Sequence, residues 1–167
     1  MKIHLWLNGK EISDDISPDM PLLEYVRTKG CYSVKRGCET SNCGLCTVWM
    51  NKKPVLSCSV LAARADGKEI VTLEGVQERA AEFGTYLANQ GGEQCGFCNP
   101  GFVMNAIALF RENPYPDEDE IKEFLSGNLC RCSGYEGQLS GILDYLRVKK
   151  AKEASVENKE NIAEEVK

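Results

Sequence analysis

The sequence of 167 residues lacks the features of several common functional classes. It holds one histidine, His4, and the alternating apolar and polar residues around it predict a strand, on which a histidine is more often a surface residue than a catalyst. No apolar run approaches the roughly 18 residues that a membrane span requires. The net charge of −5 provides no basic surface for nucleic acid or for an anionic membrane. We therefore expect neither a nucleic acid nor a membrane as a partner.

The chain also lacks a nucleotide-binding loop of its own. The nearest candidate is Gly67-Lys68, but Ala62 stands where the upstream glycine is required and Glu69 stands where a Ser or Thr is required. The acidic residues have the pattern of surface charge, helix starts and a charged tail rather than of acid–base machinery. We therefore expect no catalytic residue on this chain, and no flavin or nicotinamide site.

Cysteine is abundant instead, with nine residues in the chain. The first twenty residues contain no long apolar core, so they predict no secretion signal and favour a cytoplasmic protein. In a reducing compartment, cysteines bind metals more often than they form disulfides. Eight cysteines plus one fit two four-cysteine sites and a spare thiol, whereas a disulfide framework would leave that thiol open to exchange. Cys31 matches no ligand position, so we expect a buried thiol there, with a ligand exchange as the alternative.

The first cysteine set has the spacing Cys-x4-Cys-x2-Cys followed by a more distant cysteine, and it consists of Cys38, Cys43, Cys46 and Cys58. This is the spacing of plant-type [2Fe–2S] ferredoxins. Residues 31–46 are rich in Gly and small polar residues, so many backbone N–H groups can point inward and stabilise the negative charge of thiolates and sulfides. Gly37 and Gly44 allow a close backbone approach. The set therefore predicts an iron–sulfur site.

The second cysteine set is made of two short pairs, and it consists of Cys95, Cys98, Cys130 and Cys132. A Cys-x-x-Cys can direct both sulfurs to one point from a tight turn, and a Cys-x-Cys can do so from an irregular turn at a helix end. Four convergent thiolates suit a [2Fe–2S] cluster. A structural zinc site also takes four cysteines and is the alternative. The Cys-x-Cys spacing is unusual for zinc, so we favour the cluster.

The first half of the chain has the pattern of a small sheet with one helix. Asn8-Gly9 is a strong hairpin turn, and a helix is expected to start at Pro21 and to stop at Gly30. The expected strands are residues 2–7, 11–16, 47–50, 54–60 and 70–73. We interpret residues 1–74 as one domain.

The second half has apolar residues at helical spacing, and the expected helices are residues 76–89, 100–111, 117–125 and 137–148. Asn99 is the expected N-cap with Pro100 in the first turn, so Cys98 should lie at a helix N-terminus, where the dipole favours a thiolate. We interpret residues 75–148 as a second, helical domain. Residues 149–167 are a charged tail, expected to be a frayed helix or flexible.

Together these motifs resemble the small iron–sulfur subunit of the molybdenum hydroxylases, the xanthine dehydrogenase family. The resemblance covers residues 3–146 and rests on Gly37-Cys38, Cys43-Gly44-Leu45-Cys46-Thr47-Val48, Ser57-Cys58, Gln94-Cys95-Gly96-Phe97-Cys98, Pro100-Gly101, Gly127-Asn128-Leu129-Cys130-Arg131-Cys132 and Gly134-Tyr135. It implies an α+β fold. An N-terminal β-grasp, ferredoxin-like domain would be followed by a C-terminal four-helix bundle, each binding one [2Fe–2S] cluster.

The resemblance also implies a function and partners. The chain would be the electron-transfer subunit of a molybdopterin-dependent hydroxylase or dehydrogenase, relaying electrons from the molybdenum cofactor through two clusters toward FAD. A large molybdopterin-binding subunit and a FAD-binding subunit would complete a hetero-oligomer acting on a purine or another N-heterocycle. Gln94 would hydrogen-bond the pterin, and Cys132 would lie between its cluster and the pterin. The alternatives are a free two-cluster ferredoxin-type carrier and a zinc-stabilised regulatory module.

Overall fold

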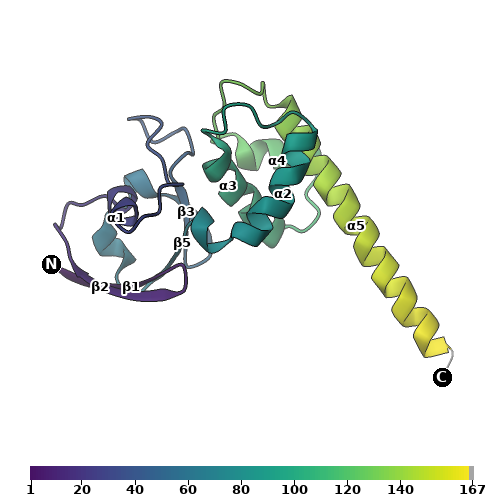
Figure 1. Cartoon of the computed structure of the whole chain (residues 1–167), viewed down its shortest axis with the longest axis horizontal. Helices are drawn as coiled ribbons and strands as arrows, with labels where there is room; N and C mark the ends of the chain where they lie inside the picture. Colours follow the sequence, from purple (N-terminus) through teal and green to yellow (C-terminus); the bar gives the residue numbers. More distant parts are fainter. Residues whose placement is uncertain (166–167) are drawn as a thin grey trace.

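The computed structural model describes the backbone of residues 1–165 and the side chains of residues 1–155. A sheet-containing N-terminal half lies against a helical C-terminal half, and one long helix extends away from both (Figure 1). The expected α+β fold, with a ferredoxin-like sheet domain before a helical domain, is confirmed. The last two residues of the expected tail, 166–167, lie outside the described residues.

One mixed sheet of five strands has the order β2-β1-β5-β3-β4. The strands are β1 (Lys2–Leu7), β2 (Lys10–Asp15), β3 (Thr47–Met50), β4 (Lys53–Leu56) and β5 (Glu69–Val71). β1 and β5 are parallel, and the other neighbours are antiparallel. Asn8 and Gly9 join β1 to β2 with φ angles of 52° and 78°, as a two-residue hairpin requires.

The first core lies between this sheet and α1 (Leu22–Thr28). Alternate residues of β1 are buried, which is the period-2 pattern of a strand with one covered face. Leu22, Leu23 and Val26 of α1 are fully buried. Gly30 follows the helix with a φ of 86°, so it ends α1 as expected.

The strand expected over residues 54–60 is shorter in the structure and ends at Leu56. A 3₁₀ turn, η1 (Ser57–Ser59), follows and carries Cys58. The reason is a nonlocal contact: the backbone N–H and the hydroxyl of Ser57 both donate to the carbonyl of Cys46, at 3.2 and 2.7 Å. These bonds turn the chain toward the first cysteine loop. Two further 3₁₀ turns, η2 (Ala62–Ala65) and η3 (Leu73–Gly75), flank β5, which ends before the expected Leu73.

The helical half contains α2 (Gln77–Asn89), α3 (Asn99–Glu112), α4 (Glu118–Leu125) and α5 (Glu136–Glu165). α3 is the central helix, with most of its residues buried in a second core. Trp49 of β3 belongs to this core, and its Nε1–H donates to the Met104 carbonyl at 2.9 Å. The Arg111 guanidinium lies 4.4 Å from the Trp49 ring centroid. The two halves are therefore packed together by shared side chains.

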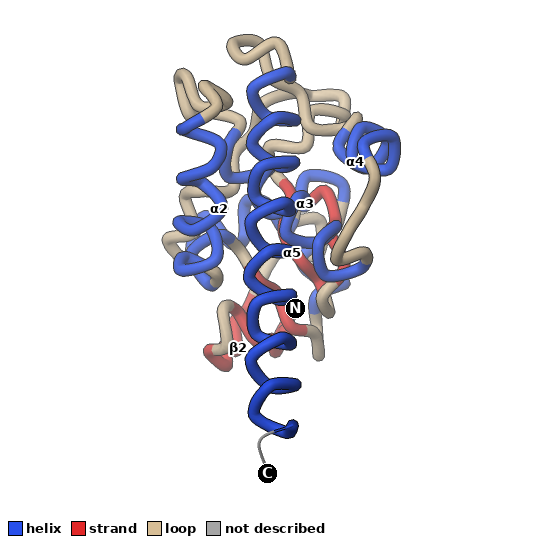
Figure 2. The backbone as a smooth tube through the Cα atoms, turned by 90° about the vertical axis from the view of Figure 1, so that its right-hand side faces the viewer, coloured by secondary structure: helices blue, strands red, loops and turns tan. Residues whose placement is uncertain are grey.

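Two details of the helices differ from the sequence-based expectation. Cys98, not Asn99, is the N-cap of α3, and no side chain caps that helix end. The helix expected over residues 137–148 continues to Glu165 as part of α5, which Figure 2 shows extending past the body of the protein. Lys, Ala and Glu dominate this extension and are good helix formers, so α5 continues past Val148. Within residues 1–165, no helix is long and apolar enough to span a bilayer.

Candidate metal centres

The sulfurs of the first cysteine set meet in pairs. Cys46 Sγ lies 3.3 Å from Cys58 Sγ, and the Cys38 and Cys43 thiols form a hydrogen bond. Cys43 and Cys46 are 7% and 3% exposed, so the surrounding chain encloses this half of the site. The two irons of a [2Fe–2S] cluster share four cysteine thiolates, two to each iron. Two sulfur pairs, three sulfurs from the loop and one from η1, therefore fit the group.

Backbone amides give Cys38 the character of a thiolate. The N–H of Asn42, the thiol of Cys43 and the N–H of Thr40 lower the pKa of Cys38 to about 6. Burial has the opposite effect on Cys46 and raises its pKa to about 11. The inward-pointing amides expected of this loop are therefore present at Cys38, while a bound cation would have to drive ionisation of Cys46.

The second cysteine set is built from two loops between helices, and its sulfurs also meet in pairs. Cys132 Sγ lies 3.5 Å from Cys95 Sγ, and the thiols of Cys98 and Cys130 form a hydrogen bond. Cys95 and Cys132 are exposed, whereas the first set has two buried cysteines, two partly exposed ones and no exposed one. Among the described residues, no three His, Cys, Asp or Glu side chains are arranged to hold a single ion.

Cys130 is surrounded by hydrogen-bond donors. The Ser133 hydroxyl lies 3.2 Å from Cys130 Sγ, and the N–H groups of Ser133 and Cys132 each lie 3.4 Å from it. Burial opposes ionisation, but these donors prevail and lower the pKa of Cys130 to about 7. Burial instead raises the pKa of Cys98 to about 11. The N–H of Cys130 itself donates to the Tyr135 hydroxyl at 3.1 Å, which fixes the loop.

Gln94 is exposed immediately before Cys95, and its side-chain amide donates to the Gly91 carbonyl at 3.2 Å. Three large apolar side chains around this set are also exposed, Phe97 at 49%, Leu129 at 41% and Tyr135 at 48%. Both residues expected to face the pterin, Gln94 and Cys132, are therefore accessible in this chain. Their pterin contacts remain predictions.

The two cysteine sets lie beside one another. Cys38 and Cys43 of the first set line the same cleft as all four cysteines of the second. The N–H of Leu129 donates to the Cys43 carbonyl at 2.9 Å. Two glycines permit this approach: a Cβ at Gly101 would lie 2.2 Å from the Gly44 carbonyl oxygen, and a Cβ at Gly44 would lie 2.5 Å from Asn128 Nδ2.

Three other residues were named from the sequence: Cys31, Lys35 and His4. Cys31 is buried, as expected, with the Asn8 amide 3.7 Å from its sulfur. Lys35 donates to the Phe97 carbonyl at 3.2 Å and so joins the two loops. His4 is partly exposed and lies 2.6 Å from Glu11 Oε1.

The sequence-based reasoning missed several residues that contact sulfur: Ser41 and Ser59 at Cys58, Ser133 at Cys130, and Gln138 at Cys98. The signal for Ser133 was its place directly after the Cys-x-Cys pair. The signal for Gln138 was its helical spacing. It lies four positions before Ile142 and eight before Leu146, so it is a polar residue on the apolar, core-facing side of α5. Its Nε2 lies 3.8 Å from Cys98 Sγ.

Comparison with known proteins decides the family. Residues 6–88 match the 2Fe-2S iron-sulfur cluster binding domain, and residues 72–143 match the [2Fe-2S] binding domain. The nicotinate dehydrogenase small FeS subunit of Eubacterium barkeri is 44% identical over 136 residues, which cover 80% of this chain and 87% of that subunit. This chain belongs to the small [2Fe–2S] subunits of the molybdenum hydroxylases.

Other relatives agree with this assignment. The xanthine dehydrogenase iron-sulfur-binding subunit of Escherichia coli O157:H7 is 40% identical, with 88% of this chain and 95% of the relative covered. In the crystal structure of quinoline 2-oxidoreductase from Pseudomonas putida 86, one chain superimposes with a TM-score of 0.83 at 36% identity, over 92% of this chain and 96% of that one. The match to the xanthine dehydrogenase of Emericella nidulans spans 11% of that protein.

The chain thus has two [2Fe–2S] binding domains, and it is an electron-transfer subunit of a molybdenum hydroxylase. The expectations of a small iron–sulfur subunit and of two clusters are confirmed.

Proposed function

We propose that this chain relays electrons between a large molybdopterin-binding subunit and a FAD-binding subunit. The residues that hold the clusters are the eight cysteines of the two sets: Cys38, Cys43, Cys46 and Cys58 in the sheet half, and Cys95, Cys98, Cys130 and Cys132 in the helical half. When bound, the two [2Fe–2S] clusters supply one-electron transfer. The chain itself positions them and sets the charge around them.

The observation that carries this proposal is the hydrogen bond from the Leu129 N–H to the Cys43 carbonyl, 2.9 Å long. It connects a cysteine of the first set to the residue that precedes Cys130 of the second. Only a few covalent bonds and one hydrogen bond then separate the two sites. A relay requires such a short, fixed connection, whereas two independent structural zinc sites do not.

The exposed part of the second set supports the direction of the relay. Gln94 and Cys132 are accessible, and exposed apolar side chains of Phe97, Leu129 and Tyr135 surround them. Apolar side chains on a surface of this kind favour contact with another protein. The molybdopterin subunit covers this face in our proposal, and the sheet half lies on the side of the flavin subunit.

The substrate of the complex is a purine or another N-heterocycle in this proposal. Relatives named for nicotinate, xanthine and quinoline support this choice. Aldehyde oxidase 2 of Cavia porcellus, 37% identical over 145 residues, represents the competing class. Assays of the purified complex with xanthine, nicotinate, quinoline and an aldehyde distinguish the two, and turnover of the aldehyde alone contradicts the heterocycle assignment.

Purification of the tagged chain from its native cell tests the relay. We expect molybdenum-containing and flavin-containing chains to copurify, with about four irons and matching acid-labile sulfide per copy of this chain. A chain that carries both clusters but purifies alone is instead a free carrier. Zinc without iron overturns the cluster assignment for both readings.

Two variants test the route. Cys43→Ser should leave reduction of molybdenum by substrate intact and abolish reduction of the flavin, because the first cluster is lost. Normal flavin reduction in this variant contradicts the route.

Gln94→Ala should slow electron transfer out of the molybdenum site, because the amide is the expected pterin contact. Gln90→Ala, which removes another exposed amide of the same loop, is the matched control. Equal rates in the two variants mean that Gln94 makes no functional contact with the pterin.

A further inference from the structure

Gln138, two residues into α5, is a buried amide with an unusual partner. Its side chain is 2% exposed, although it carries two donors and an acceptor. Nε2 donates to Cys98 Sγ across 3.8 Å, and this is its one hydrogen bond among the described residues. Oε1 has no partner there. A buried amide without full hydrogen bonding destabilises a fold, so its presence here calls for a functional reason.

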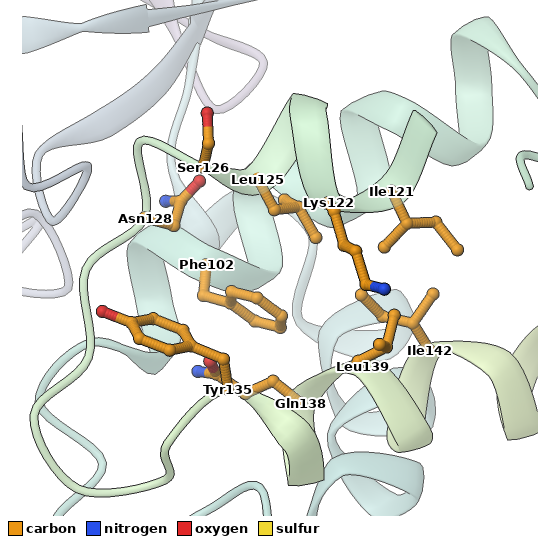
Figure 3. Close-up of a pocket in the computed structure, with 10 residues that line it drawn as sticks. All are labelled: Phe102, Ile121, Lys122, Leu125, Ser126, Asn128, Tyr135, Gln138, Leu139 and Ile142. Carbon is orange, nitrogen blue, oxygen red and sulfur yellow. The ribbon is translucent and has the colours of Figure 1, made fainter. Parts of the chain in front are cut away.

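The surroundings of Gln138 hold it in place. A cavity of about 360 Å³ lies between α3, α4 and α5, and Figure 3 shows Gln138 among its lining residues, with Phe102 of α3 and Leu125 of α4. The lining is mainly apolar, and among the described residues the amide donates to no acceptor other than Cys98 Sγ. The cavity has room for a water molecule that could donate to Oε1.

We propose that Gln138 is a positioning residue that raises the reduction potential of the helical-domain cluster by donating an N–H to the sulfur of Cys98. This inference rests on the proposed function in one respect, because it requires Cys98 to be an iron ligand. Gln138 contacts the cluster site only through the Cys98 sulfur, and it lies forty positions from Cys98 in the sequence.

The physical reason is the charge change on reduction. One added electron makes the cluster and its thiolates more negative, and an N–H dipole directed at a ligand sulfur stabilises that state more than the oxidised one. The orientation of the amide follows from the same charge. Rotating it by 180° would direct Oε1 at a thiolate, which repels it, so the bound state favours the orientation with Nε2 toward sulfur.

The donors on the neighbouring sulfur make this contact distinctive. Apart from the Cys98 thiol, Cys130 receives its donors from within its own loop, chiefly from Ser133. Cys98 is also near the side chain of Asn99, but there Oδ1 is an acceptor at 3.8 Å. Gln138 is therefore the one side-chain N–H on Cys98 among the described residues, and its removal changes the donors at one sulfur of one cluster.

Redox titration of the holoprotein, followed by EPR, tests the proposal. Gln138→Leu keeps the size of the side chain and removes the N–H. We expect the one-electron reduction equilibrium of the helical-domain cluster to shift about tenfold toward the oxidised state, or about 59 mV lower. The sheet-domain cluster is an internal reference and should not change. The Cys43→Ser variant is expected to lack the EPR signal of the sheet-domain cluster, so its spectrum shows which signal belongs to the helical-domain cluster.

Leu125→Ala is the matched control, because Leu125 lines the same cavity and its side chain has no N–H to donate to a sulfur. It should lower the melting temperature and leave both potentials unchanged. An unchanged potential in Gln138→Leu, or the same shift in both variants, overturns the proposal.

A second measurement needs no substitution at Gln138. In Gln94→Ala protein labelled with ¹⁵N in glutamine side chains, pulsed EPR should detect a ¹⁵N coupling to the helical-domain cluster, and the absence of this coupling overturns the proposal.

The Cys98→Ser variant distinguishes a failure of the ligand assignment from a failure of the role of Gln138. If that variant keeps both clusters, the ligand assignment fails; if it loses one cluster while Gln138→Leu shows no shift, only the role of Gln138 fails.

Discussion

The two cysteine sites differ in how far the chain itself encloses them. In the sheet half, Cys43 and Cys46 are buried under their own loop. In the helical half, Cys95 and Cys132 are exposed, and large apolar side chains are exposed around them. The sheet-half site thus has no exposed cysteine, although its other two cysteines are partly exposed, whereas the helical site is open at two of its four cysteines. This difference is the physical ground for expecting the molybdopterin subunit at the helical site.

The two sites also differ in how their negative charge is held. The first combines the backbone amides of a tight loop, most strongly the Asn42 N–H at Cys38, with two serine hydroxyls that lie 3.6 Å from Cys58 Sγ. The second has the Ser133 hydroxyl at Cys130 and, in addition, a side-chain amide from a distant helix, Gln138 at Cys98. A donor from a distant helix can be changed by a single substitution without altering the cysteine loops, so we expect Gln138 to be the most adjustable of these contacts.

The largest expected effect separates the sites completely. Cys46→Ser should remove only the sheet-half cluster and Cys98→Ser only the helical one, because in our proposal each set supplies all the ligands of its own cluster. Iron should fall from about four to about two per chain in each variant. Iron analysis with EPR measures this, and loss of both clusters from one substitution would show that the sites do not assemble independently.

The second prediction concerns the glycine contact between the sites. A Cβ at Gly101 would lie 2.2 Å from the Gly44 carbonyl oxygen, and this backbone atom cannot move aside cheaply. Gly101→Ala should therefore destabilise the protein by ~1–3 kcal/mol and slow electron transfer between the clusters.

The matched control for this contact is Gly84→Ala in α2, where a Cβ meets nothing within 4 Å. It should stabilise the helix by ~0.5–1 kcal/mol without changing electron transfer. Denaturant unfolding and flash-induced transfer rates measure both effects. Equal stability of the two variants would mean that the loops can separate freely.

A smaller effect is expected from the side chain that joins the halves. Trp49→Phe keeps an aromatic ring in the second core but removes the hydrogen bond to the Met104 carbonyl. The expected loss is ~0.5–1.5 kcal/mol of unfolding free energy. Trp6→Phe, at a residue 38% exposed on β1, should change it by less than ~0.5 kcal/mol. If the Trp6 variant loses as much, the interface bond contributes nothing specific.

The smallest expected effect is kinetic. When the isolated holoprotein is treated with an iron chelator, the open cluster should be lost several-fold faster than the enclosed one, because Cys95 and Cys132 are accessible. EPR signals followed over time measure the two rates. In the assembled complex the difference between the two rates of cluster loss should shrink. In the isolated protein, faster loss of the enclosed cluster than of the open one would contradict the difference in exposure.

Local patterns predicted much of the fold. The bounds of β1 and β3 agree with the expected strands because alternation and turn residues are properties of a few neighbouring residues. The errors arose where distant contacts decide. The strand before Cys58 ends early because Ser57 bonds to the Cys46 carbonyl. The helix expected over residues 137–148 continues into the tail because Lys, Ala and Glu are good helix formers.

The sequence alone determined that there are two sets of four cysteines and one spare, because spacing along the chain limits which sulfurs a single loop can direct to one point. Only the tertiary structure decided which sulfurs pair, which site is open, and that Leu129 bonds to Cys43. It alone placed Gln138 beside Cys98. These contacts join segments far apart in sequence, so they depend on how the two halves and their helices pack.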